Sequence, residues 1–335
     1  MKVGKQSWKF DNNVYIQETA TSVGPLEAEG PLGRFFDLRY QEPYLGQRTW
    51  EKAEIQLLRG TLQTLFNKTG LHERDICLAL CGDLINQLVP SNYTFREFNI
   101  PFFGLYSACA TGMQSLLMGS IFVDSFQANQ VIVGACSHNM TVERQFRNPT
   151  EYGGPKSDTA QFTVTGAGCA LLNRTPSLVR VESATAGLIV DAAQKNPNDM
   201  GSAMAPAAAH TLIQHLQDLD IEPDYYDMIV TGDLAKCGTP VLVSILRQNG
   251  YEIENIHSDC GTLIYSDRQP VFSGGSGAGC STAVTYSYLY DLLKHKKVKR
   301  ILVIATGALL NPLIMQQKET IPCIAHAVAL SAVED

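Results

Sequence analysis

The sequence predicts an α/β fold made of two similar halves, with helices and sheets stacked in five layers, α-β-α-β-α. Short apolar runs alternate with helix-length segments, which is typical of largely parallel sheets covered by helices on both faces. The order of these runs repeats along the chain, and so does their spacing. Cys109 lies 22 residues before Val131, and Gly279 lies 22 residues before Ile301. An internal repeat of this kind indicates the fold before any single motif does.

The first half carries one copy of the repeat. Apolar runs predict buried strands over residues 75–82, 102–108 and 130–136. The segment 111–126 has the length of a helix and is mostly apolar. The stretch QFTVTGAGCALL, residues 161–172, predicts a strand, a glycine-rich bend and a second strand.

The second half repeats this order. It predicts strands over 227–232, 259–265, 300–306 and 324–331, and a helix over 281–293. The central helix of each half lacks a polar face, which is typical of a helix buried on all sides. We therefore expect these two helices to pack together between two sheets.

The two halves are expected to form one compact unit. We place the N-terminal half, with its cysteine, at 1–175 and the C-terminal half at 176–335. The connecting segment 174–226 contains an amphipathic helix at 207–219. The preceding motif DMGSAMAP, residues 199–206, predicts a crossover whose proline opens that helix.

Composition excludes several classes of protein. Of the 335 residues, 45% are hydrophobic and 18% charged, which excludes bulk disorder. The net charge of −7 argues against a nucleic-acid binder, because phosphate contacts dominate that affinity. The nine cysteines form no CxxC pair and have no zinc spacing, so free thiols in a reducing, intracellular compartment are expected.

Neither a signal peptide nor a transmembrane span is expected. The first 13 residues are polar and lack an apolar core. Two stretches, 102–123 and 271–290, are long enough to span a bilayer and contain no charge. Both contain serine and glycine, and each is better explained by a strand or loop followed by a buried helix.

Cys109 is the first candidate for chemistry. It lies where the apolar run FFGLYSA turns into the helix TGMQSLLMGSIF. The macrodipole and the free N–H groups at such a helix start favour a thiolate. An ordinary buried cysteine is the alternative. We predict that Cys109 lines a functional pocket.

The cysteine elbow SACATGMQSL, the strand QVIVGAC and the strand pair TVTGAGCALL resemble the thiolase superfamily, and within it the β-ketoacyl synthase III type. In that family the elbow cysteine carries the acyl group, and a histidine and an asparagine from the second half help decarboxylate the malonyl donor. Here Asp233 follows the strand where the histidine is expected, and the loop 273–279 contains no asparagine. A thiolate without these partners loses most of its catalytic use. His138 and His326 flank strand ends and are the candidates for a substitute base.

Longer phrases resemble the stage V sporulation protein AD family of spore-forming bacteria. They are GPLG at 30–33, GACSHN at 134–139, ERQFR at 143–147, PTEYGG at 149–154, DMGSAMAP at 199–206, FSGGSG at 272–277 and QQKETIP at 316–322. The resemblance implies a thiolase-like fold without known condensing activity, in the machinery that moves dipicolinic acid and its calcium chelate into the developing spore. It implies binding of that molecule beside membrane-embedded partners of the same operon. It also implies a homodimer, as is usual in the superfamily.

Dipicolinate is a flat pyridine ring with two carboxylates, and its one-to-one chelate with Ca²⁺ has no net charge. Its pocket needs apolar walls and a few well-placed donors. The predicted ligand-binding residues are Cys109, His138, Asn139, Arg144, Arg147, Asp233, Gly275 and Ser276. No cofactor and no intrinsic metal site are expected, and Asp233 is the candidate contact for Ca²⁺ bound with the ligand. The alternative for the two arginines is pairing with Glu143 and Glu151.

The favoured function is therefore non-catalytic binding of dipicolinic acid, or its calcium chelate, during uptake into the spore. One alternative is a Cys109-dependent acyltransferase that uses His138 or His326 as base. Another is a scaffold for membrane partners. The basic run 294–300 is explained by a solvated helix end, with contact to anionic lipid as the alternative. We expect a peripheral position at the inner membrane of the forespore.

Overall fold

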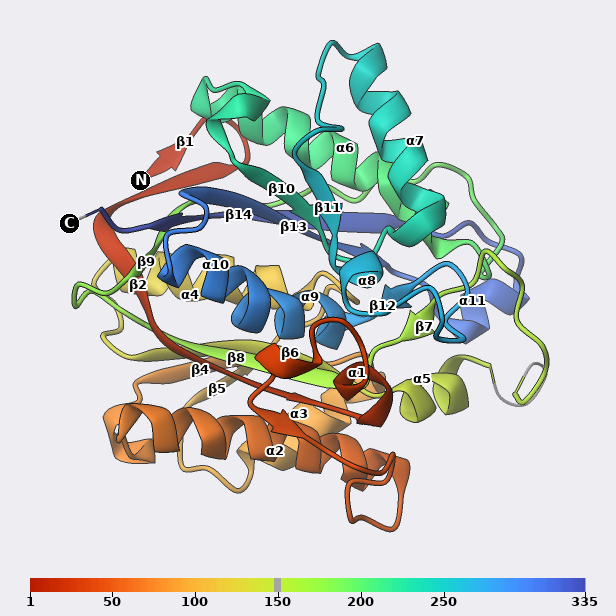
Figure 1. The fold of residues 1–335 in the computed structure, drawn as a ribbon, viewed down its shortest axis with the longest axis horizontal. Coiled ribbons are helices and arrows are strands. Elements are labelled where there is room, and N and C mark those ends of the chain that lie inside the picture. Colours follow the sequence, from red (N-terminus) through yellow and green to blue (C-terminus); the bar gives the residue numbers. More distant parts are fainter. Residues whose placement is uncertain (148–151, 335) are drawn as a thin grey trace.

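The computed structural model describes residues 1–147 and 152–334. Five layers are visible in Figure 1: helices α2 and α3, a first sheet, the central helices α4, α9 and α10, a second sheet, and helices α6 and α7. The five-layer α/β prediction is confirmed. The long helices are α2 (Trp50–Thr69), α4 (Thr111–Asp124), α6 (Met200–Leu219) and α7 (Ala235–Gln248), and the shorter ones in these layers are α3 (Val89–Phe95), α9 (Ala278–Val284) and α10 (Tyr290–Lys294).

The two sheets repeat one topology. The first has the order β5-β4-β6-β8-β2, and the second has the order β11-β10-β13-β14-β9. In both, the first three strands are parallel and the last two pairings are antiparallel. The strands are β2 (Ser7–Val23), β4 (Leu78–Gly82), β5 (Phe102–Gly104), β6 (Val131–Ser137), β8 (Gly166–Asn173), β9 (Val179–Thr185), β10 (Met228–Thr231), β11 (His257–Asp259), β13 (Arg300–Ala308) and β14 (Cys323–Ala332).

The long strand β2 joins the two sheets. Its first part, from Ser7 to Ile16, pairs with β9, and its second part, from Tyr15 to Val23, pairs with β8. The sheets therefore form one continuous hydrogen-bonded path that wraps around the central helices. The division of the chain at residue 175 stays a prediction.

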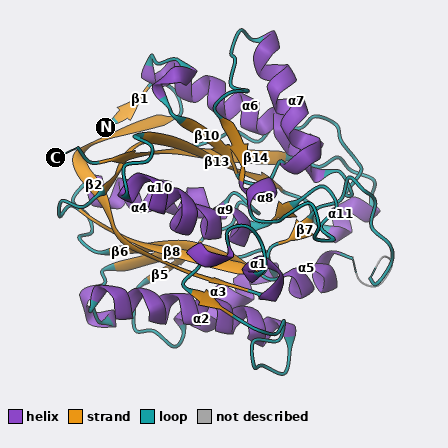
Figure 2. Cartoon of the chain, in the orientation of Figure 1, coloured by secondary structure: helices purple, strands orange, loops and turns teal. Residues whose placement is uncertain are grey.

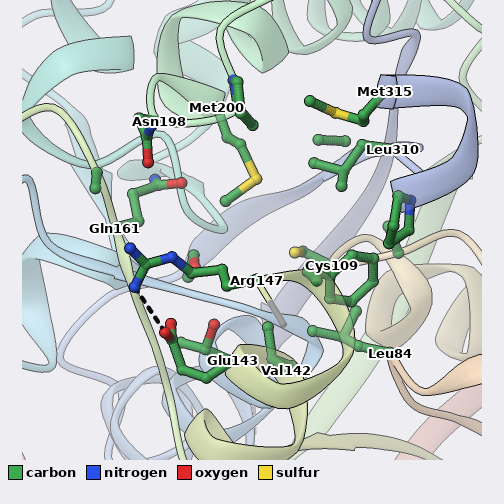
Figure 3. Close-up of a pocket in the computed structure, with 18 of the residues that line it drawn as sticks. Leu84, Cys109, Val142, Glu143, Arg147, Gln161, Asn198, Met200, Leu310 and Met315 are labelled. Carbon is green, nitrogen blue, oxygen red and sulfur yellow. Dashed lines mark hydrogen bonds and ion pairs between the residues drawn. The ribbon is translucent and has the colours of Figure 1, made fainter. Parts of the chain in front are cut away.

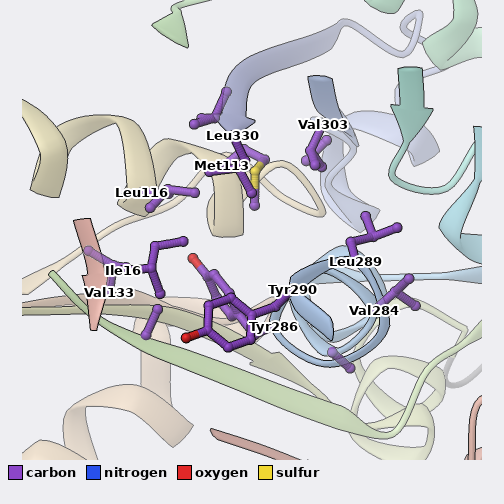
Figure 4. Packing of buried hydrophobic residues seen from close by; sticks show 14 of the residues in the cluster. Ile16, Met113, Leu116, Val133, Val284, Tyr286, Leu289, Tyr290, Val303 and Leu330 are labelled. Atoms are coloured by element: carbon purple, nitrogen blue, oxygen red, sulfur yellow. The ribbon is translucent and has the colours of Figure 1, made fainter. Parts of the chain in front are cut away.

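The central layer is the apolar core. Met113 and Leu116 of α4 and Leu289 of the π-helical turn Thr285–Leu289 pack between Val133 of one sheet and Val303 of the other (Figure 4). The helices approach closely, since a Cβ on Gly112 would lie 2.3 Å from Thr282 Cγ2. The expectation that two helices without a polar face pack between the sheets is confirmed.

Two predicted element boundaries are wrong. The segment 259–265 is not a strand: β11 ends at Asp259, whose side chain accepts from Thr262 N–H and so caps a short helix. The proline of DMGSAMAP does not open its helix. Asp199 caps α6 at Met200, and Pro206 lies inside the helix.

Short elements gather at one end of the layers, where the loops are longest (Figure 2). They include β7 (Phe162–Thr163), which pairs with β12 (Gly275–Ser276), and helices α5 (Asn139–Phe146), α8 (Cys260–Leu263) and α11 (Pro312–Gln316). Elsewhere in the chain are α1 (Pro25–Ala28), β3 (Leu38–Arg39) and β1 (Lys2–Val3), and β1 lies at the opposite end, beside the chain termini (Figure 1). Among the described residues, no helix is long and apolar enough to cross a membrane.

Candidate ligand-binding cavity

A cavity of about 290 Å³ opens beside Cys109 (Figure 3). Its size is at the lower end for ligand pockets, which have volumes from roughly 300 to 1,000 Å³. Apolar side chains form much of its wall: Leu84, Ala108, Val142, Met200, Leu310 and Met315. Its polar side chains include Glu143, Arg147, Lys156, Gln161, Asn198 and Ser276. A small ligand with an apolar body and polar groups suits this lining.

Cys109 lies at a tight elbow before α4. Ala108 has a φ of +49°, in the left-handed region, and Cys109 is 8% exposed. Strand β13 lies directly against this elbow, since a Cβ on Gly307 would lie 2.3 Å from the Ser107 carbonyl oxygen. The prediction that Cys109 lines a pocket therefore agrees with its position.

Asp233 is fully buried behind Cys109. Its carboxylate accepts from Thr306 Oγ1 at 2.5 Å and from Gly277 N–H at 3.1 Å. Burial raises the pKa of Asp233 to about 7, while its hydrogen bonds, including one from the Cys109 thiol, lower it. Asp233 does not line the cavity, so its position does not support a contact with ligand-bound calcium.

Burial at the elbow outweighs the effect of the helix start, which by itself favours a Cys109 thiolate. Burial raises the pKa of Cys109 well above its ordinary value, and the charge of Asp233 raises it further. The N–H groups of Gly277 and Cys109 act in the opposite direction but are the lesser causes. The thiol therefore keeps its proton at neutral pH.

Hydrogen bonds to the Asp259 carboxylate stabilise the loop that carries Asp233. The Asp259 carboxylate accepts from Leu234 N–H at 2.8 Å and from Ala235 N–H at 3.0 Å. Ala235 has a φ of +53°. These bonds fix a strained turn and direct the Asp233 side chain towards Cys109.

His138 has a local structural role and does not line the cavity. Its Nδ1 accepts from Met140 N–H at 3.1 Å as the cap of α5, so its proton lies on Nε2, which donates to the Pro43 carbonyl at 2.9 Å.

His326 is also buried away from the cavity wall. Its Nδ1 accepts from Gly187 N–H at 3.2 Å, and Nε2 donates to Ser107 Oγ at 3.2 Å. Burial lowers the pKa of His326 to about 4. Neither histidine is placed to act as the missing base.

Arg147 and Lys156 form a charged side of the cavity with Glu143 between them. Arg147 Nη1 donates to Glu143 Oε2 at 2.8 Å, and Lys156 Nζ donates to Glu143 Oε1 at 2.6 Å. The alternative of Arg147–Glu143 pairing is confirmed, while Glu151 lies outside the described residues. Arg144 instead pairs with Glu51 at 3.2 Å, outside the cavity.

Asn139 and Gly275 stabilise the elements beside the cavity but do not line it. Asn139 Nδ2 donates to the Thr163 carbonyl at 3.3 Å, and Gly275 pairs with Phe162 in the short parallel β12–β7 ladder. Ser276 follows in the same strand and does line the cavity. Of the eight predicted ligand-binding residues, the structure thus brings Cys109, Arg147 and Ser276 to one cavity.

Sequence reasoning missed several polar residues of the cavity, among them Lys156, Gln161 and Asn198. Gln161 Nε2 donates to the Asp233 carbonyl, while its Oε1 is buried without a hydrogen-bond partner among the described residues. Lys156 and Asn198 lie next to the motifs at 149–154 and 199–206, and this proximity was the available signal that they belong to the site. No group of three or more His, Cys, Asp or Glu side chains in 1–147 and 152–334 is arranged to hold a metal ion.

Solved structures with the same fold include two 3-oxoacyl-(acyl carrier protein) synthases III. The 3-oxoacyl-[acyl-carrier-protein] synthase III of Aquifex aeolicus VF5 superposes with a TM-score of 0.56 at 13% identity, covering 95% of this chain and 99% of that one. The corresponding enzyme of Xanthomonas oryzae pv. oryzae KACC10331 gives 0.57 at 14% identity, covering 96% and 100%. At these identities the similarity shows the thiolase-like fold and nothing about activity.

The sequence itself gives a closer relationship. Residues 4–331 match the family of stage V sporulation protein AD. The stage V sporulation protein AD of Bacillus subtilis (strain 168) is 47% identical over 325 residues, which cover 97% of this chain and 96% of that protein. The chain belongs to the stage V sporulation protein AD family.

Proposed function

We propose that this protein binds dipicolinic acid, free or as its calcium chelate, in the cavity beside Cys109. The observation that carries the proposal is the pair of cations on the cavity wall. Arg147 and Lys156 both line the cavity, and each donates to one oxygen of the Glu143 carboxylate, so two cationic donors lie at this wall. A planar dicarboxylate offers acceptors for both cations and an apolar ring face for Leu310 and Met200.

We propose that binding proceeds without covalent catalysis. The thiol of Cys109 is held protonated by burial and by Asp233, and no described histidine lies at the cavity wall. A condensing enzyme needs a reactive thiolate and a base in hydrogen-bond reach. Cys109 then contributes a polarizable part of the cavity wall.

Family membership supports a role in sporulation. We propose a role in dipicolinic acid uptake at the inner membrane of the developing spore, with the protein bound peripherally to membrane proteins of the same operon and acting as a homodimer. The basic run 294–300 gives little support for direct lipid binding. Lys297 and His295 pair with Asp291, and Arg300 pairs with Glu182.

Titration calorimetry of the purified protein with dipicolinate, with and without equimolar Ca²⁺, tests the proposal. Lys156→Gln and Arg147→Gln should each weaken binding about tenfold or more, because each removes a charge-assisted hydrogen bond to a carboxylate. Arg144→Gln is the matched control, since Arg144 pairs with Glu51 away from the cavity. Absence of saturable heat with either form of the ligand, or an equal loss in all three variants, would overturn the proposal.

A further inference from the structure

Glu143 already forms ion pairs with Arg147 and Lys156, the two cations that the proposed ligand would contact. Each of its carboxylate oxygens accepts from one cation, Oε2 from Arg147 and Oε1 from Lys156. The three side chains are only 12–15% exposed, and all three line the cavity. Partly buried charges of this kind are screened much less than charges on the surface.

A dicarboxylate dianion presents the same chemical group to this wall as Glu143 does. It must share the cations with Glu143 or displace its carboxylate from one of them. In either case two like charges come close together, which opposes binding. The neutral one-to-one calcium chelate avoids this repulsion, and its calcium carries water and prefers oxygen ligands.

A second acceptor faces the same cavity. The Asp233 carbonyl can only accept, so the Gln161 amide is oriented with Nε2 towards it and Oε1 away from it. That Oε1 is buried and has no partner among the described residues. Figure 3 shows Gln161, Arg147 and Glu143 along one side of the cavity. A buried acceptor favours a ligand that brings a donor, which hydrated calcium does and a bare dianion does not.

We propose that Glu143 is a specificity-determining residue that competes with the ligand for Arg147 and Lys156, and so shifts binding from the free dianion towards the calcium chelate. The inference rests on the proposed function. It assigns Glu143 no part in anchoring the dianion; removing its charge should therefore strengthen binding of that form.

The test is the ratio of two affinities, for dipicolinate in calcium-free buffer and for calcium dipicolinate, measured by titration calorimetry. In Glu143→Gln the ratio of dianion affinity to chelate affinity should rise about tenfold or more, because one repelling charge is removed from a partly buried site. Glu51→Gln is the matched control. It removes the carboxylate of the Glu51–Arg144 pair outside the cavity and should leave the ratio unchanged.

Lys156→Gln should move the same ratio in the opposite direction, because it removes a charge that attracts the dianion. Glu143→Ala also removes the charge and replaces Glu143→Gln in this comparison if that variant fails to fold. If the wild-type protein binds but the ratio does not shift with opposite sign in the two variants, the role of Glu143 is overturned and the proposed function stands. If the wild-type protein binds neither form, both are overturned.

Discussion

The thiol of Cys109 donates to the buried carboxyl of Asp233, the residue that stands where the resemblance to the β-ketoacyl synthase III type led us to expect a histidine. A histidine accepts the thiol proton and stabilises a thiolate, whereas a buried carboxylate repels one. Burial and the Asp233 charge together raise the pKa of Cys109. The elbow before α4 therefore holds a protonated thiol next to a buried carboxyl.

The buried Cys109 thiol should react slowly with alkylating reagents. With iodoacetamide at neutral pH, Cys109 should be alkylated at least about tenfold more slowly than the exposed Cys77, because the thiolate is the nucleophile and Cys109 is buried and protonated. Peptide mass spectrometry over a time course measures both rates in one sample. In urea the two rates should converge. Rapid alkylation of Cys109 in the folded protein would contradict the account.

Replacing the Asp233 carboxyl should lower the pKa of the Cys109 thiol. In Asp233→Asn the charge that raises the pKa of Cys109 is gone, while burial still raises it. The alkylation rate of Cys109 should rise and its pH profile should shift to lower pH, with the Cys77 rate as internal control. An unchanged or slower Cys109 rate in a folded variant would show that Asp233 does not hold the thiol protonated.

Titration of the buried Glu27 carboxyl should make the free energy of unfolding depend on pH. Glu27 is 1% exposed, accepts from Thr165 N–H at 3.0 Å and from the Tyr265 hydroxyl, and burial raises its pKa from 4.5 to about 7. The folded state thus holds this proton more tightly than the unfolded chain. Its contribution is fully present below pH 4.5 and is lost as the pH rises to 7, by about 3 kcal/mol.

Glu27→Gln keeps the shape and the acceptor but cannot ionise. Between pH 4.5 and pH 8 the free energy of unfolding of the variant should rise by up to about 3 kcal/mol relative to the wild-type protein. Urea unfolding of both proteins at several pH values measures the difference, from which other titrating groups cancel. Parallel pH profiles of the two proteins would refute this role for Glu27.

Gly307 connects the second sheet to the cysteine elbow. A methyl group there would lie 2.3 Å from the Ser107 carbonyl oxygen and 3.1 Å from Ala110 N, both backbone atoms. Gly307→Ala should therefore lower the free energy of unfolding by about 1–3 kcal/mol and weaken ligand binding, because the elbow must shift. Urea unfolding and calorimetry measure the two effects.

Gly60→Ala in α2 is the control for this change. The atoms nearest to its new methyl group belong to the ends of the Tyr40 and Leu38 side chains, and α2 does not line the cavity. Ligand affinity should be unchanged in Gly60→Ala. Normal stability and affinity in Gly307→Ala would contradict the close approach of the two segments.

The fold could be predicted because its signals are local and repeated. Apolar runs such as 130–136 and 300–306 recur at equal spacing, and buried parallel strands produce such runs directly. The place of Cys109 at a cavity followed from a strand turning into a helix. Its protonation state did not, because burial and Asp233, 124 positions along the chain, outweigh the N–H groups of the local helix start.

The charged wall of the cavity was harder to predict. Arg144 and Arg147 are three residues apart, yet one faces Glu51 on α2 and the other faces the cavity. That choice depends on how α5 packs against its neighbours, which no local pattern encodes. Lys156 pairs with Glu143, 13 positions earlier in the chain. His138 looked like a ligand donor near a strand end, and the same position is where a helix cap is needed.

The most direct test of the central claim is calorimetric titration of dipicolinate into the wild-type protein and into Cys109→Ala, followed by mass spectrometry of both after incubation with acyl-CoA. We expect saturable binding of similar affinity in both proteins and no acyl group on Cys109. Binding that disappears in Cys109→Ala, together with an acyl adduct on Cys109 of the wild-type protein, would contradict a non-covalent binding cavity and indicate an acyltransferase.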